Sequence, residues 1–137
     1  MLIPRQSALF AQQLAKWFPV LVVTGPRQSG KTTLVRELFP QLPYRSLEDP
    51  DVRAYAEEDP RSFLGSGGMV IDEVQRVPGL LSYIQTIVDT VPNSSFILTG
   101  SQNFALIERI SQSLAGRVGL LTLLPFSIAE LQAGGHP

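Results

Sequence analysis

Cysteine is absent from the 137 residues of this chain, and histidine occurs once, as His136. Without cysteine the chain forms neither disulfides nor thiolate metal sites, and the single histidine is expected to be a solvated residue near the terminus. An excess of charge of one sign is also missing, since 11 Lys and Arg face 12 Asp and Glu, for a formal net charge of −1. This balance does not indicate a nucleic-acid partner.

Long hydrophobic runs are missing as well. No apolar stretch approaches the ~20 residues that a membrane span needs, and the first five residues lack the apolar core of a signal peptide. We therefore expect no membrane association and a cytoplasmic location. With 44% hydrophobic and 17% charged residues, the composition is that of a globular protein, and residues 1–137 are expected to form one domain with a buried core.

One stretch, GPRQSGKT at 25–32, has the spacing G-x-x-x-x-G-K-[ST] of a phosphate-binding P-loop. Such a loop directs backbone N–H groups, and the positive end of the following helix, toward a phosphate chain. Lys31 would reach the β- and γ-phosphate oxygens, and the Thr32 hydroxyl would hold Mg²⁺. The β-branched run at 19–24 predicts the strand before the loop, and the apolar face within 33–39 predicts the helix after it.

Two adjacent carboxylates, Asp72 and Glu73, end a second apolar run that begins at Met69. This is the Walker B pattern, in which Asp72 would hold Mg²⁺ through its water shell and Glu73 would orient and deprotonate the attacking water. The alternative is that the pair begins a loop and caps the next helix. Downstream of a P-loop and after a buried strand, the catalytic interpretation is favoured.

Helical and strand patterns alternate along the chain, which is typical of a parallel sheet with helices on both faces. In the first helix, Phe10, Leu14 and Trp17 share the face that is expected to pack inward. The two Asp-Pro pairs each fit an N-cap followed by proline at the first helical position. The expected helices are 6–18, 33–39, those after 49–50 and 59–60, 80–91, 104–114 and, from a capping box, 127–130. The expected strands are 20–24, 44–47, 69–73, 96–99 and 118–124.

This order of motifs predicts an α/β fold, the three-layer P-loop NTPase fold with a parallel five-stranded sheet. In P-loop proteins with a catalytic glutamate after the Walker B aspartate, one further strand separates the P-loop strand from the Walker B strand. The expected spatial order is therefore 5-1-4-3-2. It places the end of the fourth strand, Thr99 to Gln102, beside the nucleotide.

Five segments occur in order: PRQSGKTT at 26–33, IDEVQ at 71–75, LTGSQ at 98–102, LAGRV at 114–118 and LPFSIAEL at 124–131. Together they resemble a prokaryotic AAA+-type P-loop ATPase family, whose ATP-binding AAA domain is usually followed by a C-terminal domain of unknown function. The resemblance covers about residues 18 to 132.

The resemblance implies ATP and Mg²⁺ as ligands and implies roles by position. Lys31 and Glu73 would act in catalysis, and Thr32 and Asp72 would hold the metal. Arg27 lies where a P-loop side chain normally points outward, so no catalytic role is given to it. The residues that would bind the nucleotide are Gly25, Pro26, Arg27, Gln28, Ser29, Gly30, Lys31, Thr32 and Thr33.

Two further catalytic positions follow from the same resemblance. Ser101 corresponds to the sensor-1 position, which hydrogen-bonds the γ-phosphate or the attacking water, and Thr99 competes for that role because both would point to one face of a strand. Ser101 could instead cap the next helix. Arg117 corresponds to an arginine that contacts the γ-phosphate, often from a neighbouring subunit, or it is a surface residue that binds helix carbonyls. Gln75 matches a polar position of the family, with no role assigned.

The function predicted from these motifs is that of a Mg²⁺-dependent ATP-binding and ATP-hydrolysing module. ATP is preferred because of the resemblance, and the Asn-Lys-x-Asp motif of GTPases is absent. One alternative is a nucleotide-dependent switch with little hydrolysis, in which ATP orders 99–102 and Arg117 to alter affinity for a partner. A small-molecule kinase is disfavoured, because no arginine-rich lid is seen and adjacent Asp-Glu suits water activation.

A protein partner, or self-association through the nucleotide site, is expected, and nucleic acid is not indicated. Relatives of this architecture continue into a helical lid or further domain that closes over the base. The sequence stops at Pro137, a few residues after the fifth strand, so a lid or C-terminal domain is expected to be absent. The chain would then be an isolated module, a truncated chain or a naturally reduced protein.

Overall fold

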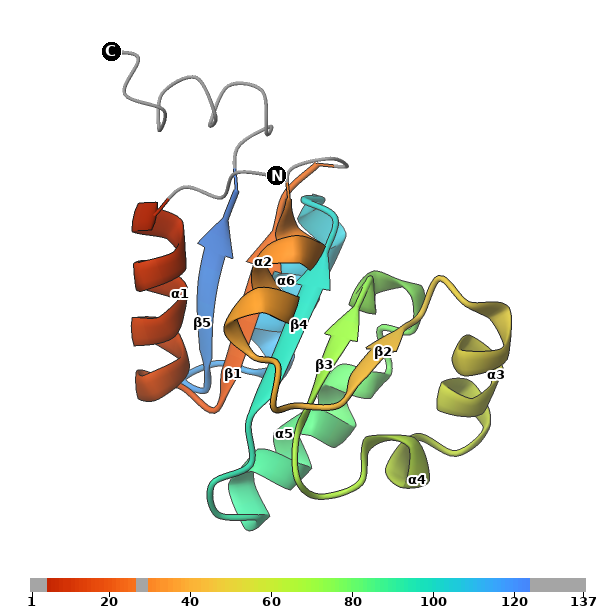
Figure 1. The fold of residues 1–137 in the computed structure, drawn as a ribbon. Helices are drawn as coiled ribbons and strands as arrows, with labels where there is room; N and C mark the ends of the chain where they lie inside the picture. The colour runs from red at the N-terminus through yellow and green to blue at the C-terminus, as the bar shows by residue number, and fades with distance from the viewer. Residues whose placement is uncertain (1–4, 27–29, 124–137) are drawn as a thin grey trace.

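A computed structural model describes residues 5–26 and 30–123 of the chain (Figure 1). The expected helices and strands within these ranges are all present, with boundaries shifted by a few residues. The capping box at 127–130 lies outside the described residues. The helices are α1 (Arg5–Trp17), α2 (Lys31–Leu38), α3 (Pro50–Glu58), α4 (Pro60–Leu64), the 3₁₀ turn η1 (Val74–Arg76), α5 (Leu80–Thr90) and α6 (Phe104–Ser113). The strands are β1 (Val20–Thr24), β2 (Tyr44–Ser46), β3 (Met69–Asp72), β4 (Phe96–Gly100) and β5 (Val118–Thr122).

The five strands form one parallel sheet in the order β2-β3-β4-β1-β5, which confirms the predicted order 5-1-4-3-2 read from the other edge. Strand β1 lies between β4 and β5, with Val20 opposite both Phe96 and Val118. Since all strands run the same way, their carboxyl ends gather at one edge, the upper edge in Figure 1. The P-loop and the carboxylates after β3 therefore meet at this edge.

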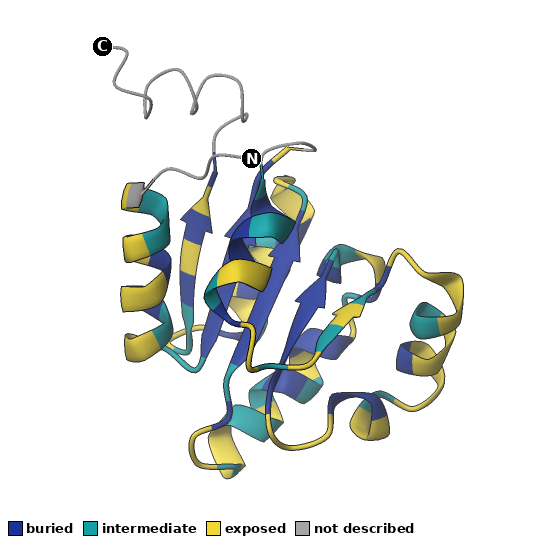
Figure 2. Cartoon of the chain, viewed as in Figure 1, coloured by how far each residue is buried: buried dark blue, intermediate teal, exposed yellow. Residues whose placement is uncertain are grey.

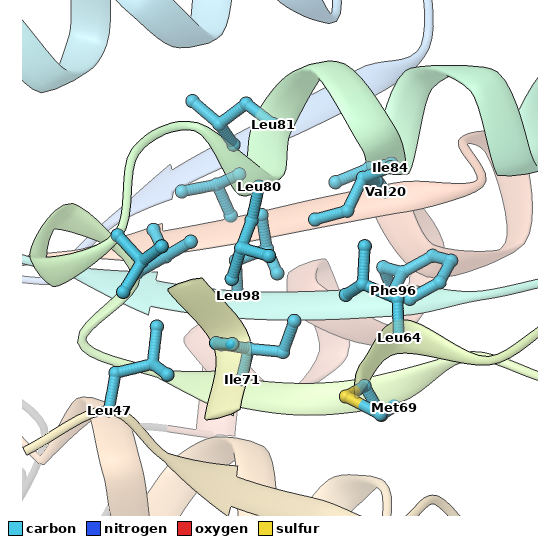
Figure 3. Close-up of a cluster of buried hydrophobic side chains, with 14 of the residues drawn as sticks. Val20, Leu47, Leu64, Met69, Ile71, Leu80, Leu81, Ile84, Phe96 and Leu98 are labelled. Atoms are coloured by element: carbon cyan, nitrogen blue, oxygen red, sulfur yellow. The ribbon is translucent and has the colours of Figure 1, made fainter. Parts of the chain in front are cut away.

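Helices cover both faces of the sheet, and each face has its own hydrophobic cluster. Alternate residues of β1 point to opposite sides, so Leu21 and Val23 join the cluster under α1 and α2. Val20 and Val22 join the larger cluster with α5 and α6, part of which is drawn in Figure 3. All five residues of β1 are buried, and Figure 2 shows the central strands as the buried layer of the molecule. The strand that leads into the P-loop is thus held from both faces.

The inward face of α1 differs from the prediction. Leu14 is buried, but Phe10 is 45% exposed and Trp17 is 70% exposed, and the helix packs through Ala11 and Leu14 instead. The reason is a close approach to β5: a Cβ added to Gly119 would lie 3.0 Å from the Cβ of Leu14. Because Gly119 has no side chain, α1 can lie close to β5 with Leu14 inward, and Phe10 and Trp17 then face outward.

Helices α3 and α4 begin as their Asp-Pro pairs predict. The Asp49 carboxylate accepts a hydrogen bond from the Asp51 N–H, and the Asp59 carboxylate accepts one from the Ser62 N–H. Pro50 and Pro60 follow at the first helical position, where no backbone donor is needed. Within the two described ranges, no helix has the length and apolar character needed to cross a bilayer.

Candidate functional site

The P-loop joins β1 to α2 at the carboxyl edge of the sheet. Gly30 caps the helix in a left-handed conformation with φ of 87°, a backbone geometry that glycine adopts without steric cost. Its carbonyl accepts the Leu34 N–H at 2.9 Å, so the helix starts directly at Lys31. Arg27, Gln28 and Ser29 lie outside the described residues. Pro26, just before them, is exposed, and Lys31, the first residue of α2, is buried.

Asp72, the last residue of β3, is the centre of a cluster of hydroxyl groups. Its carboxylate is buried, with 4% of the residue exposed. The Thr32 hydroxyl lies 2.9 Å from Oδ1 and 3.1 Å from Oδ2, and the Tyr44 hydroxyl donates to Oδ2 at 2.8 Å. The Thr99 hydroxyl donates to Oδ1. Three different elements (α2, β2 and β4) therefore hold one carboxylate of β3.

Tyr44 is a member of this cluster that the sequence patterns did not identify. Burial, and then the hydrogen bond to Asp72, raises the pKa of its phenol to about 12. The guanidinium of Arg36 lies over the ring, 4.2 Å from its centroid, within the range of a cation–π contact. The signal that could have found it was the predicted sheet order, which places the second strand beside the Walker B strand.

Glu73 follows Asp72 in a left-handed backbone conformation, with φ of 63° and ψ of 51°. This conformation is uncommon for a residue with a side chain and concentrates at functional sites. Its N–H donates to the Thr99 hydroxyl at 3.0 Å, and the Gln75 side-chain amide donates to its Oε1 at 2.6 Å. Its Oε2 lies 3.6 Å from Lys31 Nζ, which joins the P-loop to the carboxylates after β3.

The end of β4 supplies both residues that competed for the sensor position. Thr99 is fully buried and uses its hydroxyl as donor to Asp72 and acceptor from the Glu73 N–H. Ser101 lies just beyond the strand and is half-buried, and its hydroxyl accepts from the Asn103 side chain at 3.0 Å. The Asn103 side-chain amide oxygen in turn caps α6 by accepting a hydrogen bond from the Leu106 N–H. The cap of α6 is therefore Asn103, not Ser101.

The structure does not bring Arg117 to this site. Arg117 precedes β5, at the amino edge of the sheet, where its carbonyl accepts the Val20 N–H at 3.1 Å. The P-loop leaves β1 four residues later, roughly 13 Å along the strand. The guanidinium is paired with the Asp89 carboxylate at 2.7 and 2.9 Å and donates to the Ala115 carbonyl. Contact with a nucleotide held by the same chain is incompatible with this position.

The residues at the carboxyl edge fit a phosphate chain and Mg²⁺. Within the described part of the chain, Asp72 is surrounded by hydroxyl donors and has no ion-pair partner. A buried carboxylate of this kind is well suited to accept the water shell of a hard cation. Mg²⁺ is usually held by one or two protein groups together with substrate phosphates, and the Thr32 hydroxyl and the Asp72 carboxylate are groups of this kind.

The fold and the site define a P-loop nucleotide-binding module of the ATPase type. The defining features are the parallel five-stranded sheet, the P-loop between β1 and α2, and the carboxylates at the end of β3. Comparison with known proteins supports this class and narrows it. A family model described as an AAA domain matches residues 18–132. The chain belongs to this AAA domain family of AAA+-type P-loop ATPases.

Relatives in sequence include the uncharacterized proteins Rv2008c of Mycobacterium tuberculosis and Mb2031c of Mycobacterium bovis. Each is 38% identical over an alignment of 117 residues, and the match covers 82% of this chain and 26% of the relative. The chain thus spans about a quarter of the length of these relatives.

Solved structures share the fold at low sequence identity. The Walker-type ATPase PABY2304 of Pyrococcus abyssi superposes with a TM-score of 0.67 at 18% identity, covering 97% of this chain and 57% of that protein. The P-loop NTPase domain of the Sigma-54 transport activator from E. coli gives a TM-score of 0.55 at 18% identity, covering 88% and 93%. These likenesses establish the three-layer P-loop architecture.

Proposed function

We propose that this chain is the Mg²⁺-dependent ATP-binding and ATP-hydrolysing module of an AAA+-type protein. The observation that carries the proposal is the convergence of four side chains at one sheet edge. Lys31 and Thr32 come from the start of α2, and Asp72 and Glu73 come from the end of β3, joined by hydrogen bonds and an ion pair. Each has the chemistry that its proposed role requires.

Binding of the phosphate chain is assigned to the P-loop and Lys31. The backbone N–H groups at the start of α2 lack partners within the helix and favour an anion. Thr32 and Asp72 would hold Mg²⁺, which when bound would neutralise phosphate charge. Lys31 would exchange Glu73 for the β- and γ-phosphate oxygens, which carry more charge than one carboxylate.

Hydrolysis is assigned to Glu73. As the water oxygen attacks the γ-phosphorus, its proton would pass to the Glu73 carboxylate and the bond to the β-phosphate oxygen would break, releasing ADP. The strained backbone of Glu73 and its hydrogen bonds to Thr99 and Gln75 support a fixed position for this base. Ser101, half-buried at the end of β4, is proposed to contact the γ-phosphate or the water, and buried Thr99 to hold the carboxylates.

Arg117 is proposed to act on the nucleotide of a neighbouring copy. Its place at the amino edge of the sheet leaves only that route. The Asp89 partner holds the guanidinium in a fixed orientation at the surface, as a contact between subunits would require. Self-association through the nucleotide site is part of the proposal.

A second candidate function, a nucleotide-dependent switch with little hydrolysis, has specific support. Glu73 is engaged by Lys31 and Gln75 rather than free to receive a proton. The relatives are about four times as long as the matched segment, so parts of a complete site could come from elsewhere in such a protein. In that case ATP binding would be seen with phosphate release near background.

Calorimetry with Mg²⁺-ATP, with phosphate release followed on the same samples, tests both functions. Lys31→Ala should weaken ATP binding roughly 10- to 100-fold, the loss expected for charge-assisted hydrogen bonds. Lys16→Ala is the matched control, because Lys16 is an exposed lysine of α1. If wild type binds ATP but releases phosphate only at the background rate, the result supports the nucleotide-dependent switch. Binding that is equal in wild type and Lys31→Ala contradicts the P-loop assignment.

A further inference from the structure

Gln75 lies in the 3₁₀ turn η1, just after Asp72 and Glu73, and its side chain bridges two parts of the site. Its amide nitrogen Nε2 donates to Glu73 Oε1 at 2.6 Å, and its amide oxygen Oε1 accepts the Ser101 N–H at 3.2 Å. The two contacts fix the orientation of the amide, because the reverse placement would set oxygen against carboxylate and nitrogen against an N–H. One side chain thus connects the proposed base to the end of β4.

The bridge fits in space that a glycine leaves open. A Cβ added to Gly100 would lie 3.1 Å from Gln75 Oε1 and 2.6 Å from the Leu106 side chain. The amide is therefore held against the backbone of β4 with no room for a side chain there. A surface glutamine with free rotamers would have no such constraint.

The two oxygens of Glu73 have different partners. Gln75 holds Oε1, while Oε2 faces Lys31 at 3.6 Å. Under the proposed function, phosphate would draw Lys31 away from Oε2, leaving that oxygen to take the proton of the attacking water. Oε1 would stay fixed by the Gln75 amide, whose other end is anchored to the proposed sensor residue Ser101.

We propose that Gln75 is a positioning residue, which holds the Glu73 carboxylate in place and ties that placement to the backbone of Ser101. This inference deepens the proposed ATP hydrolysis and rests on it. If Ser101 shifts when it contacts the γ-phosphate, the planar amide of Gln75 would transmit that shift to the Glu73 carboxylate. Gln75 itself touches neither substrate nor metal in this scheme.

If Gln75 were purely structural, only its hydrogen bond from the Ser101 N–H would matter. The variant Gln75→Glu distinguishes this structural role from the positioning of Glu73. The glutamate side chain keeps an oxygen for the Ser101 N–H but replaces the donor to Glu73 with a second carboxylate. We expect kcat for ATP hydrolysis to fall roughly 10- to 100-fold, part of what a general base contributes, with the Kd for Mg²⁺-ATP within about threefold of wild type. Gln75→Ala, which adds no charge, should show the same split between kcat and Kd.

The charge-matched control is Gln112→Glu, on the exposed face of α6, which should match wild type. Wild-type turnover together with an unchanged kcat in Gln75→Glu and Gln75→Ala overturns the positioning role alone. So does a fall in kcat that is matched by an equal loss of ATP binding or of folded protein. A wild-type chain that releases no more phosphate than Lys31→Ala overturns the hydrolytic function, and this role with it.

Discussion

Lys31 of the P-loop and Glu73 after β3 form an ion pair, with Nζ 3.6 Å from Oε2 and only 7% and 16% of the two side chains exposed. Both charges are largely removed from water, so each depends on the other for compensation. The proposed phosphate-binding cation is thus paired with the proposed base. A nucleotide phosphate would compete with Glu73 for Lys31, which makes ATP binding and release of the base one event.

The first prediction concerns Glu73→Gln. Turnover should fall roughly 10²- to 10⁴-fold, because an amide does not accept the water proton. ATP affinity should rise about two- to tenfold, since the phosphate no longer competes with a charged carboxylate for Lys31. Phosphate release and calorimetry on the same preparation measure both effects.

Glu57→Gln, an exposed change on α3, is the control for that experiment and should alter neither quantity. Unchanged turnover in Glu73→Gln would remove Glu73 from the role of base. Weaker ATP binding in that variant would show that the carboxylate supports nucleotide binding rather than opposing it.

The second prediction concerns Tyr44 and pH. The pKa of Tyr44 is raised to about 12 from an ordinary value of 10.0, by burial first and then by the hydrogen bond to Asp72. Because folding favours the neutral phenol, its stabilising effect is complete below pH 10 and is lost as pH rises toward 12. The free energy of unfolding can be measured by urea denaturation with a chelator present to remove metal ions. Between pH 10 and 12 it should fall more steeply for wild type than for Tyr44→Phe. Parallel pH curves for the two proteins would argue against a partly buried phenol that donates a hydrogen bond to Asp72.

The third prediction separates Thr99 from Ser101. Thr99→Val removes a buried hydroxyl that joins Asp72 to the Glu73 N–H, so the free energy of unfolding should fall by about 1–3 kcal/mol. Ser101→Ala removes a half-exposed hydroxyl and should leave stability within about 0.5 kcal/mol of wild type, while turnover falls roughly tenfold or more. Urea denaturation and kcat together measure the contrast. Full activity in Ser101→Ala would indicate that Thr99 is the sensor residue. In that case Thr99→Ser, which keeps the hydroxyl, should retain activity.

The fold was predictable because its signals are local and repeated. The apolar run of β1, the caps at Asp49 and Asp59 and the periodicity of α5 each follow from neighbouring residues. The rotation of α1 was not predictable, because it depends on Gly119, about a hundred residues away in the chain. Hydrophobicity alone predicted that Phe10 and Trp17 would be buried, whereas the close contact between α1 and β5 leaves both exposed.

The same division holds at the site. Lys31, Thr32, Asp72 and Glu73 belong to contiguous motifs, and the structure brings them together. The contacts of Tyr44 and Gln75 join different elements through side-chain reach, which a linear spacing does not encode.

The last prediction concerns Arg117, which lies at the edge of the sheet opposite the P-loop and pairs with Asp89. Its hydrogen bond holds the pKa of the Asp89 carboxyl below the ordinary value, so this pair is formed at neutral pH. Because the guanidinium does not reach the nucleotide of its own chain, Arg117→Ala should leave ATP affinity and the turnover of dilute, monomeric protein unchanged.

Any catalytic effect of Arg117 must then depend on a second copy. Turnover per chain should rise with protein concentration in wild type and stay flat in Arg117→Ala, because a guanidinium supplied by a neighbour stabilises charge on the transferring phosphoryl group. Asp89→Asn keeps the guanidinium but loosens its orientation, and should give an intermediate rise. Mixing Arg117→Ala with Lys31→Ala should restore part of the activity, since one copy then offers the arginine and the other an intact P-loop. A turnover deficit of Arg117→Ala at concentrations where sedimentation shows only monomer would contradict action between copies and point to a folding defect.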